Sequence, residues 1–272
     1  MPPAFDEATL TTDIASTLSD LFAGVSPIRS AIADWAAGTT VGTGRRENQD
    51  AWGQRDGTFV VADGMGGRPG GSTAAVAAVA AALDILGTAS TLHPLDWAGR
   101  MASLNDAVIL AGRRAGHDRV GAAIAVVRCL PGRVVISHAG DVRIYRLRQG
   151  EVQLLTRDHT VGTEINSAGR DLDSVHAAIG KSAALTSFLG ATTSWQRHSL
   201  RVLDARHGDR LVMCTDGVHR RLDRGDWADV HDATECERLV EVLLDRSAAA
   251  GSTDDRTALA MTFGSGTLGS AT

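Results

Sequence analysis

Aromatic residues, cysteines and long apolar runs are all scarce in this sequence. Aromatic side chains make up 4% of its 272 residues, so alanine, valine and leucine must fill the interior. The three cysteines, Cys129, Cys214 and Cys236, lie far apart without metal-binding spacing, which indicates reduced thiols in a reducing compartment. No stretch approaches the roughly 20 apolar residues of a membrane span, and the first residues lack the basic start and apolar block of a secretory signal. These absences predict a cytoplasmic protein without a membrane span.

The charge balance excludes another class of partner. The net charge is −5 and the isoelectric point is about 6.0, so no basic field is expected to attract nucleic acid or an anionic membrane surface. Hydrophobic residues make up 43% of the chain. This content is enough for a sizeable core in one large domain of mixed α and β structure.

Hydrophobic periodicity divides the chain into a few helices and many short strands. Residues 7–23 have helical spacing and would pack on the domain or dock a partner. Further helices are expected at 71–87, capped by Ser72 or Thr73, at 94–116 and at about 234–250. Strands are expected at 58–62, 120–129, 133–138, 142–147, 152–155, 198–203, 210–214 and 256–263.

The spacing of these elements predicts how they are arranged. The four strands between residues 120 and 155 follow each other too closely for helical crossovers, so they are expected to form one antiparallel meander. Residues 160–190 are polar and irregular, which is typical of a surface excursion with a functional role. Helices beside antiparallel strands indicate an α+β layered fold.

Several apolar strands end in an aspartate that is followed by a small residue. Asp63, Asp141 and Asp216 have this position, and Asp254 stands just before the last strand. A carboxylate there costs free energy unless it is paired or bound to a metal, although a single aspartate can also simply cap its own turn. Carboxylate oxygens suit magnesium and manganese, and Gly64 would let a backbone carbonyl approach an ion. The sequence therefore favours a site for two such ions.

Six short segments stand out when they are read together and in order. They are Arg45–Asp50, Val61–Gly67, Ala139–Arg143, Leu155–Thr160, Met213–Val218 and Gly251–Thr257. This series, which covers about residues 38–263, resembles the motifs of the type 2C metal-dependent protein phosphatases in their bacterial form. The resemblance implies a four-layer αββα sandwich with two central antiparallel sheets. It also implies a phosphatase domain at 35–263 with a mobile flap at about 160–190. The residues on either side are predicted to form an N-terminal helical extension at 1–34 and a flexible tail at 264–272.

The resemblance further implies a metal centre. Asp63 would bridge two manganese or magnesium ions, and the carbonyl of Gly64 would bind one of them. Asp216 and Asp254 would bind the other ion, whereas Asp50 would hold a metal-bound water. A weaker third metal site would be formed by Asp141 together with Asp216.

The activity implied by the resemblance is the hydrolysis of phosphoserine and phosphothreonine in proteins. A hydroxide that bridges the metal ions would attack phosphorus directly, and Arg45 would bind the phosphate as a bidentate fork. The substrates would be the products of a cognate kinase in bacterial signalling. Arg45 argues against the related branch that acts on anti-sigma-factor antagonists.

Three departures from the family pattern leave alternatives open. Gln49 stands where many members have glutamate, which predicts weaker binding of the second metal. Asp255 replaces the usual asparagine, and Ser187 replaces an arginine of the flap. Gln49 and Ser187 favour a weakly active regulator that binds phosphorylated partners. A small-molecule phosphomonoesterase on the same scaffold is a further alternative.

Overall fold

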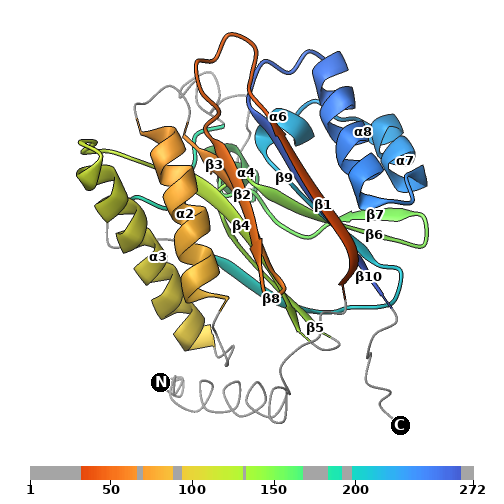
Figure 1. Ribbon diagram of the computed structural model, residues 1–272, viewed down its shortest axis with the longest axis horizontal. Coiled ribbons are helices and arrows are strands. Elements are labelled where there is room, and N and C mark those ends of the chain that lie inside the picture. The colour runs from red at the N-terminus through yellow and green to blue at the C-terminus, as the bar shows by residue number, and fades with distance from the viewer. Residues whose placement is uncertain are drawn as a thin grey trace, which may run out of the picture.

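The computed structural model describes residues 32–65, 70–87, 94–130, 133–167, 183–191 and 198–264. Two antiparallel sheets of five strands each lie face to face at its centre (Figure 1). The first sheet has the order β1 (Ile32–Thr40), β10 (Arg256–Phe263), β9 (Arg210–Cys214), β6 (Arg143–Arg148) and β7 (Glu151–Leu154). The second sheet has the order β2 (Asp50–Arg55), β3 (Thr58–Gly64), β4 (Ala122–Leu130), β5 (Arg133–Ala139) and β8 (Ser199–Asp204).

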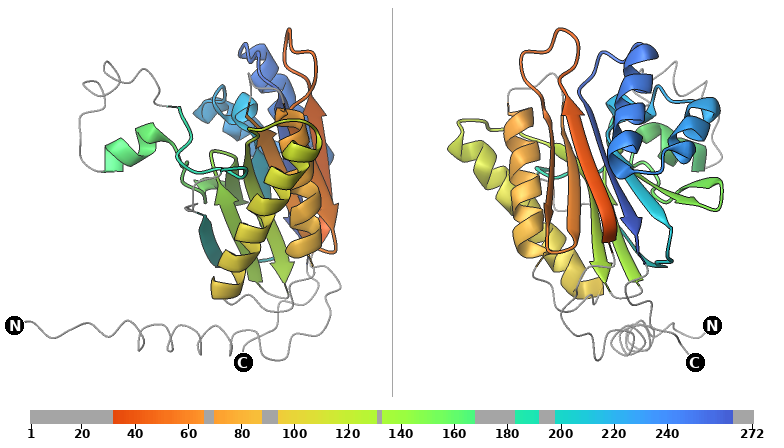
Figure 2. Two further views of the ribbon diagram at one scale, coloured as in Figure 1. Left: turned by 90° about the vertical axis from the view of Figure 1, so that its left-hand side faces the viewer. Right: turned by 45° about the vertical axis from the view of Figure 1, so that its right-hand side comes forward.

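Helices cover the outer face of each sheet, so the molecule has four layers (Figures 1 and 2). The second sheet is covered by α2 (Gly71–Ile85) and α3 (Pro94–Arg114), and the first by α7 (Arg224–Asp232) and α8 (Cys236–Ala249). The short helix α6 (Asp216–His219) follows β9, and α4 (Val161–Ser167) projects from the sandwich (Figure 2). The predicted α+β sandwich is thus confirmed. None of the described helices has the length and apolar character needed to cross a membrane.

Three apolar cores separate the four layers because the central strands bury both of their faces. In β3, Val60 and Ala62 pack under α2 and α3, whereas Phe59 and Val61 pack against the first sheet. Strands β4, β9 and β10 alternate in the same way, since successive side chains of a strand point to opposite faces. This double burial explains why these strands appear in the sequence as nearly continuous apolar runs.

The connection between β5 and β6 shows that the predicted single meander is wrong. Strands β4 and β5 pair in the second sheet, whereas β6 and β7 pair in the first. The chain crosses from one sheet to the other at Gly140, which has a φ of 104° and whose Cβ would lie 2.4 Å from that of Ala123. Close spacing excludes helical crossovers, but it does not determine whether two successive hairpins share a sheet. The crossing brings Asp141 to the end of the sandwich where both sheets meet.

The predicted strands and helices that lie within the described residues are observed, with differences at their ends, but strand β2 and helices α4, α6 and α7 were not predicted. Helix α2 has no side-chain cap, contrary to the prediction for Ser72 or Thr73; its N-cap is Gly70, with a φ of 95°. Strand β1 was not predicted, although it pairs with β10 along its whole length. The predicted helix at 7–23, most of the tail and the middle of the 160–190 segment lie outside the described residues.

Candidate metal and phosphate site

Five aspartates from both sheets converge at the end of the sandwich where the β1–β2 loop lies, at the top of Figure 1. Asp50 and Asp63 face each other across β2 and β3. Asp141 lies at the crossing between the sheets, Asp216 begins α6, and Asp254 lies just before β10. The charges of the other four all raise the pKa of Asp63, so Asp63 is at the centre of the cluster.

Burial and mutual repulsion make this cluster costly to ionise. Asp63 is partly exposed, but the dense protein around its carboxyl raises its pKa well above the usual range, and Asp50 is the next cause. Burial likewise raises the pKa of Asp50 to about 7 and that of Asp141 to about 6. A bound cation would relieve this repulsion. Because the donors are all oxygens, the cluster fits magnesium or manganese.

Gly64 follows Asp63 at a point where two backbones come very close. A Cβ on Gly64 would lie 2.1 Å from the carbonyl oxygen of Gly71 and 2.6 Å from that of Gln49. Glycine is therefore required for packing at this position. That its carbonyl also binds an ion stays a prediction.

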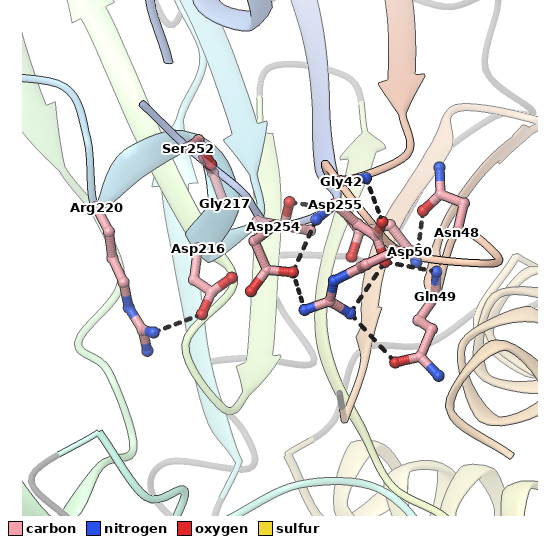
Figure 3. A network of polar contacts seen from close by, with 12 residues as sticks. Gly42, Asn48, Gln49, Asp50, Asp216, Gly217, Arg220, Ser252, Asp254 and Asp255 are labelled. Carbon is pink, nitrogen blue, oxygen red and sulfur yellow. Dashed lines mark hydrogen bonds and ion pairs between the residues drawn. The ribbon is translucent and has the colours of Figure 1, made fainter. Parts of the chain in front are cut away.

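Arg45 lies on the rim of the cluster, in the β1–β2 loop. Its Nη2 forms an ion pair with Asp254, and its Nη1 lies 3.3 Å from Oδ2 of Asp255 and from Oε1 of Gln49. Figure 3 shows this network of contacts. The guanidinium is thus held beside the aspartates; that it binds phosphate stays a prediction.

Three of the five aspartates, Asp141, Asp216 and Asp254, are paired with arginines. Arg220 pairs with Asp141 and Asp216 in the same way as Arg45 pairs with Asp254. Within the described part of the chain, no three acidic, histidine or cysteine side chains are placed to hold one ion in this arrangement. An ion bound by Asp254 would therefore have to replace the guanidinium of Arg45 at this carboxylate.

Asp50 is held in place by residues of the opposite sheet that sequence reasoning missed. The hydroxyl of Thr215 donates to Oδ2 of Asp50 at 2.8 Å and accepts from the backbone N–H of Thr257 at 3.0 Å. Thr215 is fully buried, so this bond links the two sheets beneath the site. Thr215 could have been identified from the sequence, because it directly precedes Asp216 within the segment Met213–Val218.

Asp255, which stands where the family usually has asparagine, anchors the loop that carries Arg45. Its Oδ1 accepts from the backbone N–H of Gly42 at 2.7 Å, and its Oδ2 accepts from that of Gln49 at 2.8 Å. The side chain is buried. A carboxylate can accept at both oxygens, whereas an amide offers one acceptor and one donor.

We expect Asp255→Asn to destabilise the protein by about 1–3 kcal/mol, because one buried backbone N–H would lose its acceptor. The β1–β2 loop would loosen, so KM for a phosphorylated substrate should rise more than kcat falls. Denaturant unfolding and steady-state kinetics measure the two effects. Unchanged stability and an unchanged KM would show that the amide fits and that Asp255 does not position Arg45.

The comparisons with known proteins come from sequence and from structure. The chain matches the family model "Protein phosphatase 2C" over residues 38–257, and it belongs to this family. It is 27% identical over 194 residues to the serine/threonine protein phosphatase PstP of Mycobacterium tuberculosis, a match that covers 68% of this chain and 36% of that protein. It is 26% identical over 205 residues to the protein phosphatase PhpP of Streptococcus pneumoniae, covering 71% and 81% of the two chains.

The chain thus spans little more than a third of the mycobacterial relative. Among solved structures, a crystal structure of the catalytic domain of PstP in complex with two manganese ions has a TM-score of 0.72 at 22% identity. The superposition covers 84% of this chain and 96% of that one. This likeness establishes the fold, and the resemblance stated from the motifs is confirmed.

Proposed function

We propose that this chain is a metal-dependent serine/threonine phosphoprotein phosphatase, a phosphoric monoester hydrolase. The observation that carries this proposal is the convergence of four aspartates around Asp63, with Arg45 on the rim, in a member of the protein phosphatase 2C family. Two divalent ions, manganese or magnesium, would activate a water for attack on phosphorus and offset the charge of the phosphoryl group. The manganese ions of the PstP structure support this choice of metal.

The aspartates of the chain would hold and orient these ions. Asp63 at the centre of the cluster would contact both of them, and the carbonyl of Gly64 would contact one. Asp216 and Asp254 approach from the other sheet and would bind one ion. Asp50, fixed by the hydroxyl of Thr215, would orient a water at the other.

Arg45 would bind the phosphate of the substrate. An ion bound by Asp254 competes with the guanidinium for the same carboxylate, so one edge of the fork would become free for an anion. Asp255 and Gln49 would keep its other nitrogen in place. A planar guanidinium binds phosphate through two parallel hydrogen bonds, which a lysine cannot reproduce.

The substrates would be phosphoserine and phosphothreonine proteins made by a cognate kinase. The names of the mycobacterial and pneumococcal relatives support phosphoproteins as the substrate class. The three cysteines are free and buried, which fits a reducing compartment such as the cytoplasm.

Hydrolysis of an aryl phosphate and of a phosphothreonine peptide, with and without manganese, tests the proposal. The wild type should turn over both only with the metal, and Asp216→Asn should lower kcat by about two to three orders of magnitude. Asp84→Asn is the control, because Asp84 lies on the exposed surface of α2, paired with Arg55. Metal-independent turnover, or full activity of Asp216→Asn, would contradict the two-metal hydrolase. A preference for sugar phosphates over the peptide would indicate the small-molecule enzyme.

A second candidate is a regulator that binds phosphorylated partners with little turnover. Ser187, at the position of the flap arginine, is buried, so the segment supplies no positive charge there. Binding of the phosphothreonine peptide by folded, manganese-loaded protein without its hydrolysis would favour this function.

A further inference from the structure

Arg220 bridges two aspartates of the site that come from different sheets. Its Nη1 lies 2.7 Å from Oδ2 of Asp216, and its Nη2 lies 2.8 Å from Oδ2 of Asp141. The Asp141 side chain is 7% exposed, whereas that of Arg220 is 45% exposed. The guanidinium of Arg220 therefore lies between the solvent and the carboxylates of Asp141 and Asp216. Figure 3 shows its bond to Asp216.

The short helix α6 fixes Arg220 in this place. Asp216 begins the helix, and Arg220 is its C-cap, whose backbone N–H donates to the carbonyl of Asp216 at 3.1 Å. His219 bonds to the backbone carbonyl of Asp141 through Nε2 at 2.9 Å. A carbonyl oxygen only accepts, so Nε2 carries the donated hydrogen. The end of α6 thus contacts Asp141 twice: His219 bonds to its backbone carbonyl, and Arg220 pairs with its carboxylate.

The third metal site expected from the family would use the same two carboxylates. Each of them directs one oxygen at the guanidinium, and an ion between them would have to replace Arg220. Waters can supply several of the six oxygen ligands that magnesium and manganese prefer, but the guanidinium of Arg220 already bonds to the carboxylate oxygens that such an ion would need. With Arg220 in this place, Asp141 and Asp216 do not fit a third ion.

We propose that Arg220 is a permanent internal cation that takes the place of a third metal ion between Asp141 and Asp216. A guanidinium stays charged at every relevant pH, so it keeps both carboxylates paired while Asp216 retains its other oxygen for the main metal centre. The inference rests on the proposed function only in assigning Asp216 to that centre. Arg220 is a positioning residue in this role, since it acts through Asp216.

Counting bound manganese tests the inference without measuring catalysis. Metal-free protein is titrated with manganese, and free ion is measured by electron paramagnetic resonance after equilibrium dialysis. The wild type should bind two ions, and Arg220→Met should bind a third, weaker one, because the guanidinium no longer fills the site. The double variant Asp141→Asn with Arg220→Met should return to two. Arg221→Met is the matched control, since Arg221 is exposed and takes part in none of the ion pairs between the described residues.

The outcomes separate this inference from the proposed function. Three ions in the wild type, or no additional ion in folded Arg220→Met, would overturn the role of Arg220 and leave the two-metal hydrolase intact. No manganese bound to the wild type would overturn both. If Arg220→Met does not fold, as judged by circular dichroism, Arg220→Gln retains a polar side chain without the charge and is expected to give the same third ion.

Discussion

Asp63→Asn should lower kcat by about three orders of magnitude, roughly 4 kcal/mol of transition-state stabilisation, while making the metal-free protein more stable. Catalysis falls because the central carboxylate of the cluster is lost. Stability rises because one member of a set of repelling, buried charges becomes neutral. Near pH 8 the expected gain is about 1–3 kcal/mol. Such opposite changes are typical of a residue kept for function at a cost in stability.

A buried aspartate away from the site provides the control for this experiment. Asp209 is buried and accepts from Arg148 through both oxygens, at 2.5 Å each. Asp209→Asn should therefore lose stability and retain kcat, the reverse of Asp63→Asn. Full activity of Asp63→Asn would remove Asp63 from the metal centre, and a loss of stability in its metal-free form would show that its charge is well compensated.

The metal-free protein should lose stability as the pH rises from about 4 to about 7, and manganese should restore it. The pKa of Asp50 is about 7 in the folded state and that of Asp141 is about 6, against the ordinary 3.8. Between these values the folded chain holds protons that the unfolded chain has released, so raising the pH favours unfolding. Together the two shifts correspond to a loss of about 5 kcal/mol between pH 4.5 and 7.5.

Thermal unfolding at several pH values, with chelator or with manganese, measures this linkage. Manganese should raise Tm strongly at pH 7.5 and little at pH 4.5, because the ion competes with protons for the same carboxylates. Asp63→Asn should flatten the pH dependence of the metal-free protein. A Tm that is independent of pH, with no response to manganese, would mean that the cluster neither holds protons nor binds ions.

Local patterns in the sequence were sufficient to predict many of the strands and helices and the aspartate cluster. Strands β9 and β10 were predicted with their observed bounds, because apolar runs flanked by polar turns persist whatever the strands pair with. The clustering of Asp63, Asp141, Asp216 and Asp254 followed from one repeated feature, an acidic residue at the end of a buried strand. Strand β1 escaped prediction because all of its residues are exposed or only partly buried, so it has no strong apolar pattern.

The sequence by itself determined the layered α+β class, the order of the motifs and the oxygen-only character of the site. It did so because these properties depend on residue type and short-range period. Tertiary structure alone decided which sheet each hairpin joins and which partner each carboxylate takes. Arg220 meets Asp141 across 79 positions, and Arg45 meets Asp255 across 210. Such pairings arise only when two sheets pack face to face, since no local pattern records which distant side chain will lie within reach of a buried charge.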